Sequence, residues 1–344
     1  MKTNVRLILS AFVISLLMLA ACVVAPPATS LETQEMAVDS DADMDTSDMS
    51  DADMDTSDMA DEDTPAEADA PAPQMPPPVM NQLAEGVYHY FGFFASSLVV
   101  VSDEGVLITD TGSDMKAQSL KEEIAKITDA PVTTIVMTHE HYDHVGGSGV
   151  FEDAQVICHV NCQAVFDLFD NPFGDVPEVD QTFEDYMAIN VGDKVVELHY
   201  LGPGDGDATT IIYMPEEQII VTSDMYEPRA LTHANWVEDK NFTGTRQILN
   251  TISQWPLKHA INAHSLDTGL QDLNENVEYY NDLYEVVYTA IQEALAQGPF
   301  FTVYALYDTL PETVHLEKYQ DWANYESSFA RHVQRMAVSI FHGD

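Results

Sequence analysis

The stretch Thr138-His139-Glu140-His141-Tyr142-Asp143-His144-Val145-Gly146-Gly147 gathers three imidazoles and one carboxylate within six residues. The apolar run before it, 133–138, predicts a buried strand, so these side chains should stand on a turn at the end of that strand. On such a turn they can converge on one volume. Imidazole and carboxylate together suit zinc, iron or manganese. Packing alone does not explain such a cluster, and we therefore expect a metal site.

Segments typical of strands and of helices alternate on both sides of this stretch. Strands are expected at 86–93, 97–101, 105–109, 133–138, 155–159, 195–201, 210–214, 218–222 and 261–263. Helices are expected at 115–127, 243–254, 277–296 and within 319–340, where apolar residues recur at helical spacing. This alternation predicts an α/β fold in which helices cover sheets.

The His-rich segment matches the HxHxDH signature of the metallo-β-lactamase superfamily. The chain from about Gly86 to Ala296 resembles that family further, because weaker motifs follow in the expected order. These motifs are Asp110-Thr111-Gly112, the loop 202–207, Ser223-Asp224 and Ala263-His264-Ser265. The resemblance implies an αββα four-layer sandwich, here with a C-terminal helical extension. It also implies that Asp110 supports the ligand loop and does not bind metal.

The resemblance implies a site for two divalent transition metals, with zinc expected and iron or manganese as alternatives. One metal would take His139, His141 and a ligand from the third motif. The second metal would take Asp143, His144 and His264, and Asp224 would bridge the two. Asp143 would also orient the attacking water, as the catalytic residue.

The third motif departs from the family pattern, which normally supplies a histidine there. An ungapped alignment from Gly202 places Asp205 at that position, whereas a gapped alignment would mean that a His-Thr pair is deleted. Asp205 as an oxygen ligand would give a harder site and would require the loop to approach more closely. Without a ligand there, the first metal would bind weakly. Asp207 is a further oxygen candidate, and His199 a less favoured substitute.

General metal chemistry then indicates the reaction. Bound metals bring the pKa of water toward neutrality, and the metal-bound hydroxide attacks an ester, lactone, thioester or amide-type substrate. The loop after Asp224 should lie beside the metals, and loops carry substrate contacts. Its candidates are Tyr226, Arg229 and His233, of which Arg229 could hold a substrate carboxylate. A non-catalytic binding or scaffold lipoprotein, or a di-iron redox protein, is the alternative to this metallohydrolase.

The N-terminus predicts export and lipidation. Lys2 and Arg6 precede the apolar stretch 7–21, which is too short for a comfortable transmembrane helix. It ends in Leu19-Ala20-Ala21-Cys22, which resembles the lipobox of bacterial lipoproteins and implies cleavage before Cys22 and acylation, such as palmitoylation, of that cysteine. An ordinary secretory signal is the alternative. We expect an exported lipoprotein, anchored to a membrane outside the cytoplasm.

Four segments follow from these patterns: a signal peptide (1–21), a disordered acidic and Pro-rich tether (22–81), the metallo-β-lactamase-like domain (82–297) and a helical extension packed on it (298–344). In the tether a ten-residue unit, 41–50, is almost repeated at 51–60. Calcium loops also alternate acids, but the repeat lacks their central Gly and closing Glu. Like-charge repulsion favours disorder instead.

Charge and cysteines narrow the class of partner. The net charge of -45, with only 13 Lys and Arg, argues against binding to nucleic acid, which needs clustered cations. A small-molecule substrate is expected instead. Cys158 and Cys162 could pair, but we favour simple packing for them.

Overall fold

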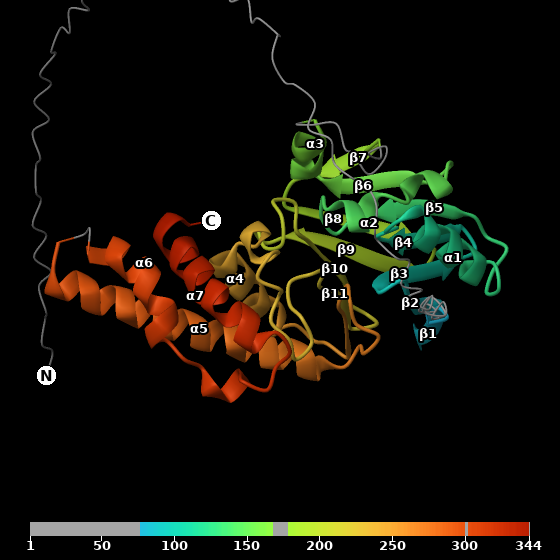
Figure 1. Cartoon of the computed structure of the whole chain (residues 1–344). Coiled ribbons are helices and arrows are strands. Elements are labelled where there is room, and N and C mark those ends of the chain that lie inside the picture. Colours follow the sequence, from blue (N-terminus) through green and yellow to red (C-terminus); the bar gives the residue numbers. More distant parts are fainter. Residues whose placement is uncertain (1–75, 168–177, 300–301, 344) are drawn as a thin grey trace, which may run out of the picture. The chain divides into compact units, whose positions relative to one another are not determined.

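The structure is a computed structural model that describes residues 76–167, 178–299 and 302–343. In that part of the chain two β-sheets face each other, with helices on their outer sides (Figure 1). The first sheet has the spatial order β1 (Val79–Ala84), β2 (Val87–Gly92), β3 (Ala95–Ser102), β4 (Gly105–Thr109), β5 (Val132–Val136), β6 (Gln155–His159) and β7 (Gln181–Phe183). The second has the order β12 (His259–Ile261), β11 (Ile219–Val221), β10 (Thr210–Met214), β9 (Lys194–Tyr200) and β8 (Tyr186–Val191).

Both sheets are mixed. Strands β1 to β4 are antiparallel neighbours and β4 to β7 are parallel, while β8 to β11 are antiparallel and β12 is parallel to β11. The helices are α1 (Asp114–Ile124), α2 (Tyr142–Val145), α3 (Val160–Phe166), α4 (Phe242–Ile252), α5 (Leu270–Gln297), α6 (Thr302–Thr313) and α7 (Tyr325–His342).

The alternation of side chains along β3 explains the layering. Leu98 packs between the sheets in a buried cluster that includes Leu198 and Ile212 of the second sheet. Val99, the next residue, packs on the other face in a cluster with Leu120 of α1. Successive strand residues point to opposite faces, so an apolar run such as β3 is stable only when both faces are covered.

The outer face of the second sheet is covered by the later helices. Ile211 and Ile220 of this sheet share one buried cluster with Ile248 of α4, Leu283 of α5 and Val333 of α7. These helices gather on one side of the second sheet in Figure 1. With α1 on the first sheet, the layers follow the order αββα, so the predicted fold class is confirmed. The C-terminal helices form part of the outer layer.

Some boundaries differ from the sequence-based expectation. The first strand begins at Val79, inside the stretch assigned to the tether, because Met80 and Leu83 already pack against the core clusters. Helix α5 begins at Leu270, and its buried positions start at Leu273. The predicted lipobox with Cys22 and the acidic repeat lie outside the described residues. Among the described residues, no helix has the length and apolarity needed to cross a membrane.

Cys158 and Cys162 are joined as a disulfide between the end of β6 and α3, with their Cα atoms 6.2 Å apart. Both residues are buried. The favoured expectation of simple packing is therefore corrected: α3 starts directly after β6, and its first turn brings the second thiol back to the first.

Candidate metal centre

The His-rich segment follows β5, as the sequence predicts, and part of the expected turn forms the short helix α2. His141 caps this helix, and Asp143 and His144 lie on it. The ring centroids of His139 and His141 are 4.4 Å apart, and those of His139 and His144 are 4.2 Å apart. One strand end and one helical turn thus bring three imidazoles together.

His139, His141 and Asp205 form a first group, whose candidate ligand atoms lie within 4.8 Å of one another. Nδ1 of His139 lies 2.9 Å from Ser223 Oγ. Its Nε2 is buried and has no hydrogen-bond partner among the described residues. Burial lowers the pKa of His139 well below its usual value, which leaves the ring neutral. A neutral imidazole with a buried, unpaired nitrogen has the form that metal coordination requires.

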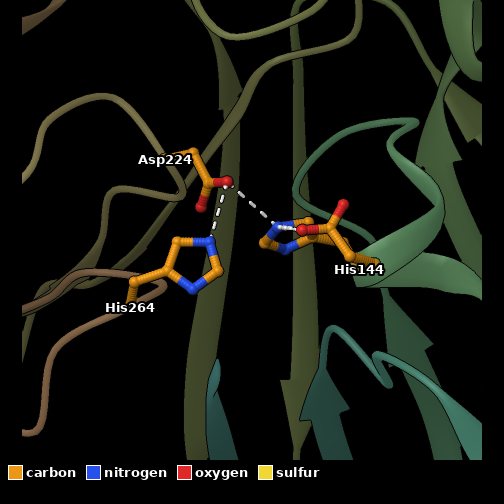
Figure 2. Close-up of side chains that lie close together, drawn as sticks. His144, Asp224 and His264 are labelled. Atoms are coloured by element: carbon orange, nitrogen blue, oxygen red, sulfur yellow. Dashed lines mark hydrogen bonds and ion pairs between the residues drawn. The ribbon is translucent and has the colours of Figure 1, made fainter. Parts of the chain in front are cut away.

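Asp143, His144, Asp224 and His264 form the second group, with ligand atoms again within 4.8 Å. Figure 2 shows His144 and His264 turned toward the same carboxylate of Asp224. The distances to Asp224 Oδ2 are 3.1 Å from His144 Nε2 and 3.2 Å from His264 Nε2. Asp143 Oδ2 lies 3.5 Å from His144 Nε2. The other oxygen of Asp224, Oδ1, is buried without a partner among the described residues.

The second group favours positive charge. Burial acts to lower the pKa of His264, but Asp224 outweighs it and raises this pKa to about 9. In His144 burial is likewise outweighed, chiefly by Asp224 and Asp110, and the pKa rises well above 6.5. Burial disfavours ionised Asp224, yet the two histidines hold its pKa well below the ordinary range. The raised pKa values of the two histidines show that the carboxylates around them favour positive charge at this place, which suits a divalent cation. Both groups therefore fit a metal.

Asp110 fixes the ligand loop, as the resemblance implies. Its Oδ1 accepts a hydrogen bond from Thr138 N at 2.8 Å, and its Oδ2 accepts from Thr138 Oγ1 at 2.7 Å. Oδ2 also lies 3.0 Å from Nδ1 of His144. With a φ of 43°, Asp110 adopts a left-handed conformation that costs energy and that structures maintain mainly at functional sites.

Glu140, which the sequence analysis passed over, holds the third-motif loop. Its Oε1 accepts from Asp207 N at 2.6 Å and its Oε2 from Ala208 N at 3.1 Å. A Cβ at Gly206, where φ is +81°, would lie 2.7 Å from Oε2 of Glu140. Glycine and this carboxylate therefore let the loop approach the ligand segment closely, as an aspartate ligand with a shorter reach than histidine would require.

A second residue missed from the sequence, Lys240, lies beside the first group. Its Nζ is 2.7 Å from Asp205 Oδ2 and also donates to the main-chain oxygen of Asp224. The residue belongs to no motif. The one feature of the sequence that could have drawn attention to Lys240 is the scarcity of cations, since the chain has 13 Lys and Arg among 344 residues.

A cavity of about 650 Å³ opens onto both groups. From these groups His141, Asp143, Asp205 and His264 line it, together with residues that include Glu227, His233, Trp236 and Asn324. Asn324 precedes α7 in the C-terminal extension, and its neighbour Ala323 accepts a hydrogen bond from Leu231 N at 2.9 Å. The extension therefore forms part of the cavity wall.

The predicted substrate contacts are only partly placed at this cavity. His233 lines it, but Tyr226 and Arg229 do not. Tyr226 is 1 % exposed and packs in the core beneath α5, where its apolar ring is shielded from water. Arg229 pairs with Glu275 of α5 at 3.2 Å, because that helix offers the nearer carboxylate. Asp207 is exposed and lies outside both ligand groups, as does His199, which pairs with Glu197.

Comparison with known proteins gives a consistent family and fold. The family model described as the metallo-beta-lactamase superfamily matches residues 90–280. A metallo-beta-lactamase type 2 from Bacteroides fragilis is 24% identical over 211 residues, which cover 58% of this chain and 83% of that protein. The metallo-beta-lactamase IND-1 from Chryseobacterium indologenes is 22% identical over 187 residues, which cover 52% of this chain and 72% of that protein.

Among solved structures, a metallo-beta-lactamase from Pontibacter korlensis has a TM-score of 0.52 and 17% sequence identity. The match covers 59% of this chain and 99% of that chain. At this identity the likeness concerns the fold.

Proposed function

The chain belongs to the metallo-beta-lactamase superfamily, and on that premise we propose that it is a metal-dependent hydrolase of esters, lactones, thioesters or amides outside the cytoplasm. The observation that carries the proposal is the pair of adjacent ligand groups. Each holds a buried atom with no partner among the described residues, His139 Nε2 in one and Asp224 Oδ1 in the other.

The ligand assignment follows the two groups. The first metal would be held by His139, His141 and Asp205, and the second by Asp143, His144 and His264, with Asp224 between the two metals. We propose zinc because four of the seven proposed ligands are imidazoles, which suit this metal. The oxygen of Asp205 makes the first position harder, which keeps iron and manganese as alternatives.

When bound, two such metals lower the pKa of water and polarise the oxygen of the substrate under attack. The side chains of the protein supply the remaining functions. Burial opposes ionisation of Asp143, but the hydrogen bond and charge of His144 outweigh it and lower the pKa. Asp143 is therefore an ionised acceptor on the cavity, able to orient a water. His233, also on the cavity, offers an imidazole to the substrate.

Substrate class is limited by two features. Asp224 replaces the cysteine that one β-lactamase subclass uses as a ligand, which disfavours that subclass. The amide class still includes β-lactams, the substrates for which the similar proteins are named. The second feature is the C-terminal extension, since Asn324 lines the cavity and would contact a bound substrate.

Export and membrane anchoring through Cys22 remain part of the proposal, supported by the lipobox-like sequence. The disulfide between Cys158 and Cys162 supports it independently, because disulfides persist in oxidising compartments. A Cys22→Ser variant should lose labelling by radioactive palmitate and leave the membrane fraction. Retention of label in that variant would contradict lipidation at Cys22.

The function is tested on the full chain, purified in detergent. Metal analysis should find about two equivalents of transition metal, and chelator-sensitive hydrolysis should appear in a panel of esters, lactones, thioesters and β-lactams. His144→Asn should lose metal and activity, while His342→Asn, an exposed histidine in α7, should keep both. A wild-type chain without metal would indicate the alternative, a non-catalytic binding lipoprotein on this fold.

A further inference from the structure

Asp205 brings a negative charge to a ligand position where the family resemblance places a neutral histidine. The residue is 3 % exposed, so little water reaches this charge. Lys240 is equally buried, at 3 % exposure, and its Nζ lies 2.7 Å from Asp205 Oδ2. The charges of the two side chains cancel inside the protein.

The backbone fixes this pair. Asp205 and Lys240 are partners in an isolated antiparallel bridge. Two hydrogen bonds flank it, from Gly206 N to Asp239 O at 3.3 Å and from Asn241 N to Gly204 O at 2.7 Å. The lysine is therefore held opposite the aspartate by main-chain pairing, and its position does not depend on a long side chain finding a partner.

The two oxygens of Asp205 have different surroundings. Oδ2 is held by Lys240, whereas Oδ1 lies 3.9 Å from Nδ1 of His141, another member of the first ligand group. Lys240 Nζ donates both to Asp205 Oδ2 and to the main-chain oxygen of Asp224, and two such acceptors suit an ammonium group. A lysine has no acceptor and cannot itself bind metal while protonated.

We propose that Asp205 and Lys240 act as one neutral ligand unit in place of the third-motif histidine, with Lys240 as a positioning residue that holds Oδ2 and leaves Oδ1 for the first metal. This inference rests on the proposed metal-dependent function. The unit keeps the net charge of a three-histidine site while it presents oxygen. In the metal-free protein, loss of either partner leaves a buried charge without its counter-ion, which is strongly unfavourable.

The test is a double-mutant cycle on the full chain: Asp205→His, Lys240→Met and the two combined. Zinc per chain is measured at buffered free zinc, together with the thermal midpoint of each protein. Each single change should weaken the first zinc site about 10- to 100-fold while the second group keeps its zinc. The combined variant should regain the first zinc, because histidine without lysine restores neutrality. Lys194→Met, a lysine away from the site, serves as the control.

The possible outcomes distinguish a failure of this inference from a failure of the proposed metal-dependent function. Wild-type protein that binds no zinc overturns both. If the wild type binds both zincs, the proposed function stands and the variants test the inference. The inference is overturned if either single variant keeps wild-type zinc affinity, or if the combined variant binds the first zinc no better than the single variants. Single variants that fail to fold, beside a combined variant that folds and binds both zincs, support the inference. If all three fail to fold, the nearly isosteric Asp205→Asn should lose the first zinc, and its retention would overturn the inference.

Discussion

Asp110 and His144 are 34 positions apart in the chain, yet Asp110 Oδ2 accepts a hydrogen bond from Nδ1 of His144 at 3.0 Å. The same carboxylate holds Thr138, which precedes the ligand segment. His144 is therefore fixed so that its Nε2 faces Asp224. One buried aspartate sets both the start of the ligand loop and the direction of one of its ligands.

Asp110→Asn should consequently weaken metal binding without removing a ligand. The amide nitrogen of the substituted side chain would face a hydrogen-bond donor of Thr138 or His144. The imidazole ring of His144 would then lose its fixed orientation. We expect metal affinity to fall about 10- to 100-fold, measured by competition with a chromophoric chelator. Asp103→Asn, at an exposed position, should change nothing. Equal affinities for the two variants would show that Asp110 does not orient the ligands.

Zinc uptake should release protons from the second group. Since the pKa of metal-free His264 is about 9 and that of His144 is raised well above 6.5, both rings carry a proton at neutral pH. Ligands must be deprotonated to bind, so affinity should rise with pH up to about 9 and fall as pH is lowered. Titration calorimetry at pH 7.5 in buffers of different protonation enthalpy should show about two protons released. His264→Asn should release one fewer, and a release near zero in wild type would refute the assignment.

His332 should make the fold sensitive to acid. It is buried between α7, the loop at Thr232 and Tyr279, and burial lowers its pKa to about 4. The unfolded chain takes up this proton below about 6.5 and the folded chain does not, so stability is lost as pH falls from 6.5 toward 4. The full difference is about 3 kcal/mol.

His332→Gln should remove this pH dependence, because glutamine does not titrate. Unfolding free energies in urea at pH 7 and pH 4.5 should differ less in the variant than in the wild type. The exposed His342→Gln is the matched control and should behave like the wild type. Parallel behaviour of His332→Gln and the wild type would contradict the expectation.

Asn324 should affect substrate binding from the C-terminal extension. It lines the cavity, and its Nδ2 donates to Leu231 O at 3.1 Å. Its φ of 62° is a left-handed conformation that asparagine tolerates better than most residues. We expect Asn324→Ala to lower stability by about 1–2 kcal/mol and to raise KM several-fold, with metal content unchanged.

Kinetics with a substrate found in the assay panel, beside thermal unfolding, would measure both effects of Asn324→Ala. Asn235→Ala, at an exposed position in the loop that carries His233, is the control. An unchanged KM in Asn324→Ala would mean that the extension supports the wall without meeting the substrate.

Much of the fold could be read from the sequence because its signals are local. The apolar run of β3 and the helical spacing in α1 report which faces are buried, whatever lies opposite. Strand β1 was missed, since Val79–Ala84 is only partly buried and follows a Pro-rich run. The disulfide was missed because spacing alone does not show how β6 turns into α3.

The sequence by itself determined the candidate ligand segment, since four side chains of ligand type on one strand-end turn must converge over so short a distance. Only the tertiary structure decided what surrounds them. Lys240 meets Asp205 across 35 positions because two loops pair through their backbones, and Asn324 reaches the cavity because the extension packs beside Leu231. Arg229 pairs with Glu275 because the fold places helix α5 beside the loop that carries the arginine. Such contacts depend on which surfaces pack together, and the free energy of that packing is a property of the whole fold, whereas a short motif carries its geometry within itself.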